Sequence, residues 1–162
     1  MVSGTQFDLA DNDLIVDYDV ASPAGTWNGS NSYTGLTGLI AAGRQQLGWN
    51  GNGIVSSAAR VNSSVTTLGV AEASDALQLG LGQSGVFSGE TVDSTAILIK
   101  YTYLGDLNLD GRDNIDDYGI IDGAIGRGFT GYYHGDVNYD GKIDIDDMAT
   151  LDVTIAMQGV PL

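Results

Sequence analysis

Two twelve-residue segments near the C-terminus carry oxygen-donating side chains at a spacing that suits a bound calcium ion. They begin at Asp106 and Asp136, 30 residues apart, and both follow the pattern Asp-x-Asn-x-Asp-Gly with aspartate at position 12. Calcium binds about six to eight oxygens, and such a loop supplies them from positions 1, 3, 5, 7, 9 and 12. The glycines at position 6, Gly111 and Gly141, permit a sharp bend that a Cβ atom opposes. The two segments therefore predict two calcium sites.

Each loop supplies side-chain oxygens together with the backbone carbonyl of position 7. The predicted ligands of the first loop are Asp106, Asn108, Asp110, Arg112, Asn114 and Asp117. The predicted ligands of the second loop are Asp136, Asn138, Asp140, Lys142, Asp144 and Asp147. At position 9 the second loop has an aspartate where the first has an asparagine, and this extra negative charge predicts tighter calcium binding. Without a cation, repulsion among the carboxylates opposes closure of each loop. The alternative is a pair of Asp- and Gly-rich turns that bind no metal.

Each loop is followed by a segment with the apolar spacing of a short helix. In both segments apolar residues recur at i, i+3 and i+7, which places them on one face of a helix. These residues are Tyr118, Ile121 and Ile125 after the first loop and Met148, Leu151 and Ile155 after the second. We expect two loop–helix units whose apolar helix faces pack against each other about a pseudo-twofold axis.

The segments GDLNLDGRDNIDDYGIIDGAI and GDVNYDGKIDIDDMATLDVTI resemble the duplicated repeats of dockerins. Dockerin repeats are calcium loop–helix units that lack the entering helix of an EF-hand. The resemblance covers residues 105–157 and implies two bound Ca²⁺ ions and an extracellular or cell-surface location. The preceding stretch, from WNGNGIVSSAAR to VDSTAILIKYTYLGD, is similar to a segment found before such repeats near the C-termini of large secreted bacterial proteins.

The resemblance also implies a class of partner. Cellulosomal dockerins attach glycoside hydrolases to cohesin-bearing scaffolds, often through a Ser-Thr pair at loop positions 10 and 11. This chain has Ile115-Asp116 and Ile145-Asp146 at those positions, which departs from the cohesin-binding pattern. Position 8 is usually apolar in the family, so Asp113 predicts a looser first loop.

Residues 1–104 differ in composition from the two loops, with many Gly, Ser, Thr, Val and Leu residues and few charges. Period-two alternation predicts strands at 14–20 and 96–104, and a weaker pattern predicts a strand at 65–71. A helix is expected over 34–46, and a helical turn is expected at 54–60. The apolar face of the predicted helix comprises Leu36, Leu39, Ile40 and Leu47.

These elements predict an α+β fold with two domains. Residues 1–104 are expected to form a β-rich layer with one or two short helices, in which one strand edge stays unpaired. Residues 105–162 are expected to form a dockerin-like pair of calcium loop–helix units.

Composition limits the classes of partner. The chain has 162 residues, is 43% apolar and carries a formal net charge of −15, with 12 of its 21 acidic residues between Asp106 and Asp152. The apolar content predicts a packed core, and the charge disfavours nucleic acid and anionic lipid. Cysteine is absent, which excludes disulfides and thiolate sites. No apolar run is long enough to span a membrane.

The N-terminal sequence lacks the basic and apolar regions of a signal peptide. We therefore expect a cytoplasmic chain or a mature or excised piece of a secreted precursor, and the resemblance favours the second.

Three other groups of residues were candidate sites. His134, the single histidine, has no identifiable titratable partner in the sequence, so a packing or exposed role is favoured over catalysis. The five aspartates between Asp8 and Asp19 lack the loop spacing, and a solvated strand face is favoured over a third cation site. For the aromatic side chains, packing is favoured over a sugar-stacking platform; they are Trp27, Trp49, Tyr132 and Tyr133.

The sequence therefore favours a non-catalytic extracellular calcium-binding module that acts in surface attachment or self-assembly. The expected partner is another protein or a copy of the chain, and one form of this hypothesis is a fibre subunit joined by strand addition. The first alternative is a dockerin-type adaptor that binds a cohesin-like partner in a polysaccharide-degrading assembly. The second is a fragment of a carbohydrate-active enzyme, which ranks lowest because the close carboxylate pairs belong to the calcium loops.

Overall fold

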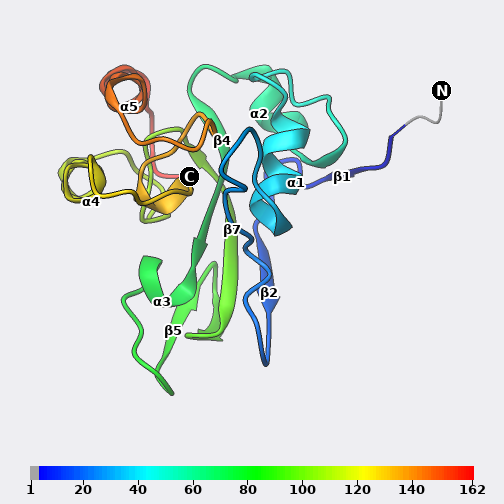
Figure 1. Ribbon diagram of the computed structural model, residues 1–162, viewed down its shortest axis with the longest axis vertical. Helices are drawn as coiled ribbons and strands as arrows, with labels where there is room; N and C mark the ends of the chain where they lie inside the picture. Colours follow the sequence, from blue (N-terminus) through cyan, green and yellow to red (C-terminus); the bar gives the residue numbers. More distant parts are fainter. Residues whose placement is uncertain (1–3) are drawn as a thin grey trace.

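A three-stranded antiparallel sheet with the order β2-β7-β4 lies at the centre of the fold (Figure 1). In the computed structural model, which describes residues 4–162, β2 spans Leu14–Asp17, β4 spans Thr66–Glu72 and β7 spans Ala96–Tyr103. The central strand β7 is buried along most of its length, because its continuous apolar and aromatic run is covered on both faces.

This sheet confirms the strands expected at 65–71 and 96–104, and it corrects the strand expected at 14–20. Strand β2 ends at Asp17, and Val20 is 96% exposed instead of sharing the buried face. The alternation of apolar residues continues beyond Asp17, but the partner strand has no further residues to pair with it. Asp17 already pairs with Ala96, the first residue of β7.

Two smaller sheets complete the strand content of residues 4–104. Strand β1 pairs in parallel with β3, and β5 pairs with β6 as an antiparallel hairpin. Their bounds are Gln6–Asp8 for β1, Gly53–Val55 for β3, Ser84–Phe87 for β5 and Glu90–Asp93 for β6. The segment expected as a helical turn at 54–60 therefore divides into the end of β3 and the helix α2.

Three helices belong to this part of the chain. They are α1 (Gly35–Arg44), α2 (Ser57–Val61) and α3 (Ala73–Ala76). Helix α1 confirms the helix expected at 34–46, but its Leu39 is exposed, and Thr37 is buried beside Ile40 instead. A Cβ atom on Gly43 would lie 2.0 Å from the backbone oxygen of Ile54. The glycine thus lets α1 approach β3 closely.

The C-terminal part contains α4 (Ile115–Ala124), the 3₁₀ turn η1 (Tyr132–His134) and α5 (Ile145–Met157). In Figure 1, α4 and α5 lie on one side of β4 and β7, and α1 lies on the other. On the apolar faces expected for these two helices, Ile121 and Leu151 are fully buried, whereas Ile125 and Ile155 are exposed. Helix α4 ends at Ala124, and α5 buries Thr154 in place of Ile155.

One hydrophobic cluster joins both parts of the chain. It contains Ile40 and Leu68 from the first part and Leu107, Ile121 and Leu151 from the second. The α+β fold is confirmed, while the division at residue 104 stays a prediction. None of the helices within residues 4–162 has the length and apolarity needed to cross a membrane.

Candidate metal centre

The two loops at 106–117 and 136–147 bend in the same way, through hydrogen bonds from backbone N–H groups to their first aspartate. Asp106 accepts from Asp110 at 3.0 Å and from Gly111 at 2.8 Å. In the second loop Asp136 accepts from the equivalent residues at 3.1 and 2.8 Å. Both glycines have positive φ, 90° for Gly111 and 83° for Gly141, as the bend requires.

The last aspartate of each loop closes the loop by accepting a hydrogen bond from a backbone N–H near the start of that loop. Asp117 accepts the N–H of Leu107 at 2.8 Å, and Asp147 accepts the N–H of Val137 at 3.0 Å. The same aspartates form a capping box with position 9, where each following helix begins. Positions 1 and 12 are thus held together in both loops before any ligand is considered.

The remaining predicted ligands lie at the open side of each loop. In the first loop the amide nitrogens of Asn108 and Asn114 both lie 3.5 Å from Asp110 Oδ2. In the second loop Asn138 Oδ1 accepts the N–H of Asp140 at 2.8 Å, and Asp144 caps α5. The side chains at position 7 point into solvent, in keeping with a ligand role for their carbonyls alone; they are Arg112 and Lys142.

The aspartates at positions 1 and 12 of both loops are fully buried, and none of them forms an ion pair within residues 4–162. Asp106, Asp117, Asp136 and Asp147 have no solvent exposure. The one ion pair within residues 4–162 joins Lys100 to Asp13, at 3.4 Å and outside the loops. A buried carboxylate is costly unless a partner charge or a metal compensates it.

The electrostatics of the loops reflect this burial. Desolvation raises the pKa of Asp106 and Asp147 to about 7 and that of Asp117 to about 6, and it also raises the pKa of Asp136. Hydrogen bonds from backbone N–H groups lower these pKa values only in part. The carboxylates at the base of each loop are thus desolvated and have no ion-pair partner within residues 4–162.

The donor chemistry fits a hard cation. Every predicted ligand offers oxygen, which suits calcium or magnesium better than the softer metals that select thiolate or imidazole. In the part of the chain that the structure describes, no three His, Cys, Asp or Glu side chains converge as a metal site by themselves. Neither loop, as the described residues are placed, brings three of its predicted carboxylate ligands together.

The first loop is attached to the end of α5. Gln158 accepts the N–H of Asp113 at 3.0 Å and donates to its carbonyl oxygen at 2.6 Å, while Thr154 donates to the Asp113 carboxylate. The sequence predicted that Asp113 loosens this loop, and that prediction was wrong. The aspartate instead fastens the loop to the C-terminal helix, leaving its Oδ1 without a hydrogen-bond partner.

This attachment predicts a specific loss of stability. Replacing Thr154 with valine keeps the shape of the side chain but removes the hydrogen bond to a buried carboxylate, at an expected cost of about 1.5–3 kcal/mol. Urea unfolding at saturating calcium measures the change. Thr150→Val, one turn earlier, removes only a bond to the Asp146 carbonyl. Equal losses for the two variants would contradict a fastening role for Asp113.

The second loop is attached to the N-terminal part of the chain. Tyr33 donates to Asp136 and accepts the N–H of Gly131 at 2.8 Å. Arg44 donates to the carbonyl oxygen of Asn138 at 3.2 Å, and the indole of Trp27 lies against Gly141. Sequence reasoning missed the roles of Tyr33 and Arg44, which lie far from the loop in the chain and match no motif.

The other candidate residues have structural roles. Trp49 and Tyr132 are core residues, which excludes them from an exposed sugar platform. His134 stacks on Phe129 with ring centroids 4.7 Å apart. Among the N-terminal aspartates, Asp8 accepts the N–H of Ser57, at the start of α2. For Trp49, Tyr132 and His134 these observations favour the packing interpretations.

No protein-family model matches this chain, and no curated protein or solved structure is significantly similar to it. The dockerin resemblance therefore remains a prediction that rests on the residues of the two loops.

Proposed function

We propose that this chain is a non-catalytic, extracellular calcium-binding module that acts in surface attachment or self-assembly. The observation that carries the proposal is the pair of loops that fold alike and bury aspartates at positions 1 and 12 without an ion-pair partner. Two Ca²⁺ ions would supply the missing charge. At millimolar extracellular calcium, such loops fill even when their affinity is modest.

Calcium would also organise the whole molecule in this proposal, because both loops contact the rest of the chain. Thr102 of β7 donates to Asp106, and Tyr33 donates to Asp136. Binding energy gained in either loop is therefore linked to folding of the central sheet and of the segment before α1. A partner-binding surface formed jointly by the loops and the N-terminal part of the chain would then form only when calcium is bound.

Self-assembly is supported by an open strand edge. Strand β2 forms one edge of the central sheet. The N–H of Tyr18 points to Thr95, just before β7, at 3.0 Å. Because alternate N–H groups of a strand point in opposite directions, the N–H of Asp17 faces the open edge. A strand from a second copy of the chain could pair there.

Calcium binding is tested by calorimetric titration of chelator-treated protein. We expect two Ca²⁺ ions to bind per chain, and we expect Asp144→Asn to weaken the tighter site to about the affinity of the first loop, because this change removes the extra charge of the second loop. No heat of binding at millimolar calcium would overturn the proposal.

Strand addition is tested by sedimentation and electron microscopy of the calcium-loaded chain. Asp17→Pro removes the outward N–H and is expected to reduce assembly, whereas Val20→Pro, outside the strand, serves as its control. Monomers alone under all conditions would contradict self-assembly.

Two exposed apolar side chains offer a contact surface for the alternative of a cohesin-like partner, although they depart from the Ser-Thr pattern of cellulosomal dockerins. Ile115 is 78% exposed and Ile145 is 72% exposed, both at position 10 of their loops. Pull-down against a panel of cohesins, with Ile115→Asp and Ile145→Asp as paired variants, tests this alternative. Failure with every cohesin would remove it.

A further inference from the structure

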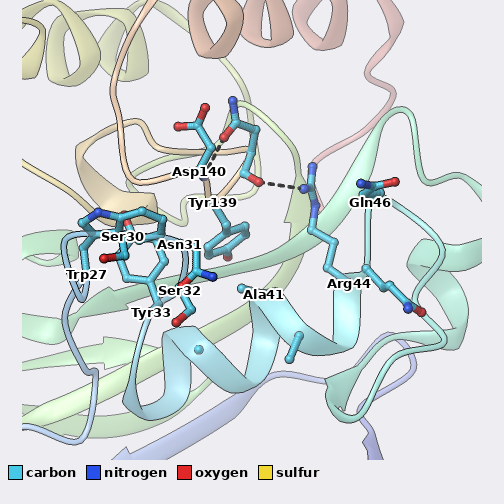
Figure 2. A pocket seen from close by; sticks show the side chains of 14 residues that line it. Trp27, Ser30, Asn31, Ser32, Tyr33, Ala41, Arg44, Gln46, Tyr139 and Asp140 are labelled. Atoms are coloured by element: carbon cyan, nitrogen blue, oxygen red, sulfur yellow. Dashed lines mark hydrogen bonds between the residues drawn. The ribbon is translucent and has the colours of Figure 1, made fainter.

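A hollow of about 520 Å³ opens between α1, the segment 27–33 and the second loop (Figure 2). Its volume falls within the roughly 300–1,000 Å³ typical of small-molecule sites. Trp27 and Tyr33 lie on one side of it, Arg44 lies on the other, and Tyr139 lies between them. The hollow is thus built from parts of the chain about 100 residues apart.

Arg44 is the unusual member of this wall. Its side chain comes from the last turn of α1 and is only 8% exposed, yet it forms no ion pair within residues 4–162. One guanidinium nitrogen donates to the Asn138 carbonyl, and the group lies 5.7 Å from the centroid of the Tyr139 ring. Its Nε has no hydrogen-bond partner. A buried guanidinium of this kind is suited to a planar carboxylate.

The rest of the lining is rich in hydroxyl and amide groups. Exposed side chains that both donate and accept hydrogen bonds come from two segments, and they are Ser30, Asn31, Ser32, Gln45 and Gln46. Trp27 adds part of an aromatic ring. Its ring centroid lies 5.0 Å from that of Tyr33, in an edge contact. Such a lining matches a ligand with many hydroxyl groups and one apolar ring face.

We propose that this hollow binds a saccharide that carries a carboxylate group. Arg44 binds the carboxylate, the amides and hydroxyls of the two segments bind the sugar hydroxyl groups, and Trp27 contacts the ring. Asp140 also lines the hollow, and its charge would repel the ligand unless the second loop holds calcium. In this respect alone the inference rests on the proposed calcium site.

The test uses the full chain in millimolar calcium and two matched sugars, methyl β-D-glucuronide and its neutral counterpart methyl β-D-glucoside. NMR titration is expected to show at least about tenfold tighter binding of the glucuronide, because a charge-assisted bidentate pair forms only with the acid. Equal affinities, or no glucuronide binding at millimolar concentration, would overturn the inference. N-acetylalanine is the third probe, and binding as tight as that of the glucuronide would overturn the saccharide class.

Two variants locate the binding. Ala42→Phe fills the hollow from an exposed position on α1 and is expected to abolish binding, while Ala156→Phe makes the same change at an exposed position of α5. Arg44→Gln is expected to reduce glucuronide affinity to that of the glucoside. Unchanged glucuronide binding in Ala42→Phe would overturn the assignment, even if Arg44→Gln fails to fold.

Calcium titration of each variant separates the two proposals. Glucuronide binding by a chain that binds no calcium would refute the metal site and leave the sugar site standing. Calcium binding without glucuronide binding would support the metal site and refute the sugar site.

Discussion

Replacing Asp110 and Asp140 together with asparagine is expected to abolish the rise in melting temperature that calcium produces in the unaltered chain. A ligand at about 100 times its dissociation constant stabilises a protein by about 2.7 kcal/mol per site, so two sites would contribute about 5 kcal/mol. That is a large share of the roughly 5–15 kcal/mol that holds an ordinary domain folded. We therefore expect chelation of the unaltered chain to cause a comparably large fall in its melting temperature.

These two positions separate metal binding from loop structure. Each carboxylate accepts one backbone N–H through Oδ1, from Arg112 or Lys142 at 2.9 Å, and the oxygen of asparagine retains that bond. Both residues are exposed, so without calcium the double variant is expected to melt at or slightly above the temperature of the unaltered chain.

The control is the pair Asp116→Asn and Asp146→Asn, which removes equal charge from exposed position 11 of the same loops. Calorimetry with calcium, with magnesium and with chelator provides the comparison. Equal responses of the two double variants would show that net charge, and not ligand identity, governs stability. An unchanged melting temperature of the unaltered chain under chelation would refute the calcium site.

Gly141→Ala is expected to destabilise the calcium-loaded protein by about 2–5 kcal/mol. The left-handed conformation costs a residue with a Cβ atom about 1–2 kcal/mol, and overpacking adds about 1–3 kcal/mol. At this position φ is +83°, and a Cβ atom would lie 2.1 Å from the Trp27 indole. Relief requires the indole to leave the loop, so the contact between the second loop and the N-terminal part should weaken as well.

Gly111 is the matched position of the first loop, with φ of +90°. There an added Cβ atom meets the backbone oxygen of Leu162 at 2.3 Å. Because Leu162 is exposed and lies outside any helix or strand, it can move aside more readily than a packed indole, and we expect Gly111→Ala to show mainly the backbone cost. Urea unfolding of both variants, followed by Trp fluorescence, measures the difference. A larger loss for Gly111→Ala would contradict the role assigned to Trp27.

The internal form of the two loops could be predicted from the sequence because it is local. Asp106 and Gly111 are five residues apart, and the hydrogen bond that bends the loop joins these two residues directly. The strand at β7 was predictable for a related reason, since an apolar run of this length is buried wherever the chain places it. Alternation over 14–20 was a weaker guide, because it did not indicate where the partner strand begins.

The surroundings of the loops were decided by tertiary structure alone. Tyr33 meets Asp136 across 103 residues of sequence, and Asp113 meets Thr154 across 41. Neither pair shares a motif or a periodicity, because a hydrogen bond between distant segments depends on how the sheet and helices pack. For the same reason the sequence did not indicate that Arg44 is buried without an ion-pair partner. Residue types and spacing determined which oxygen donors each loop carries, whereas packing determined which side chains surround it.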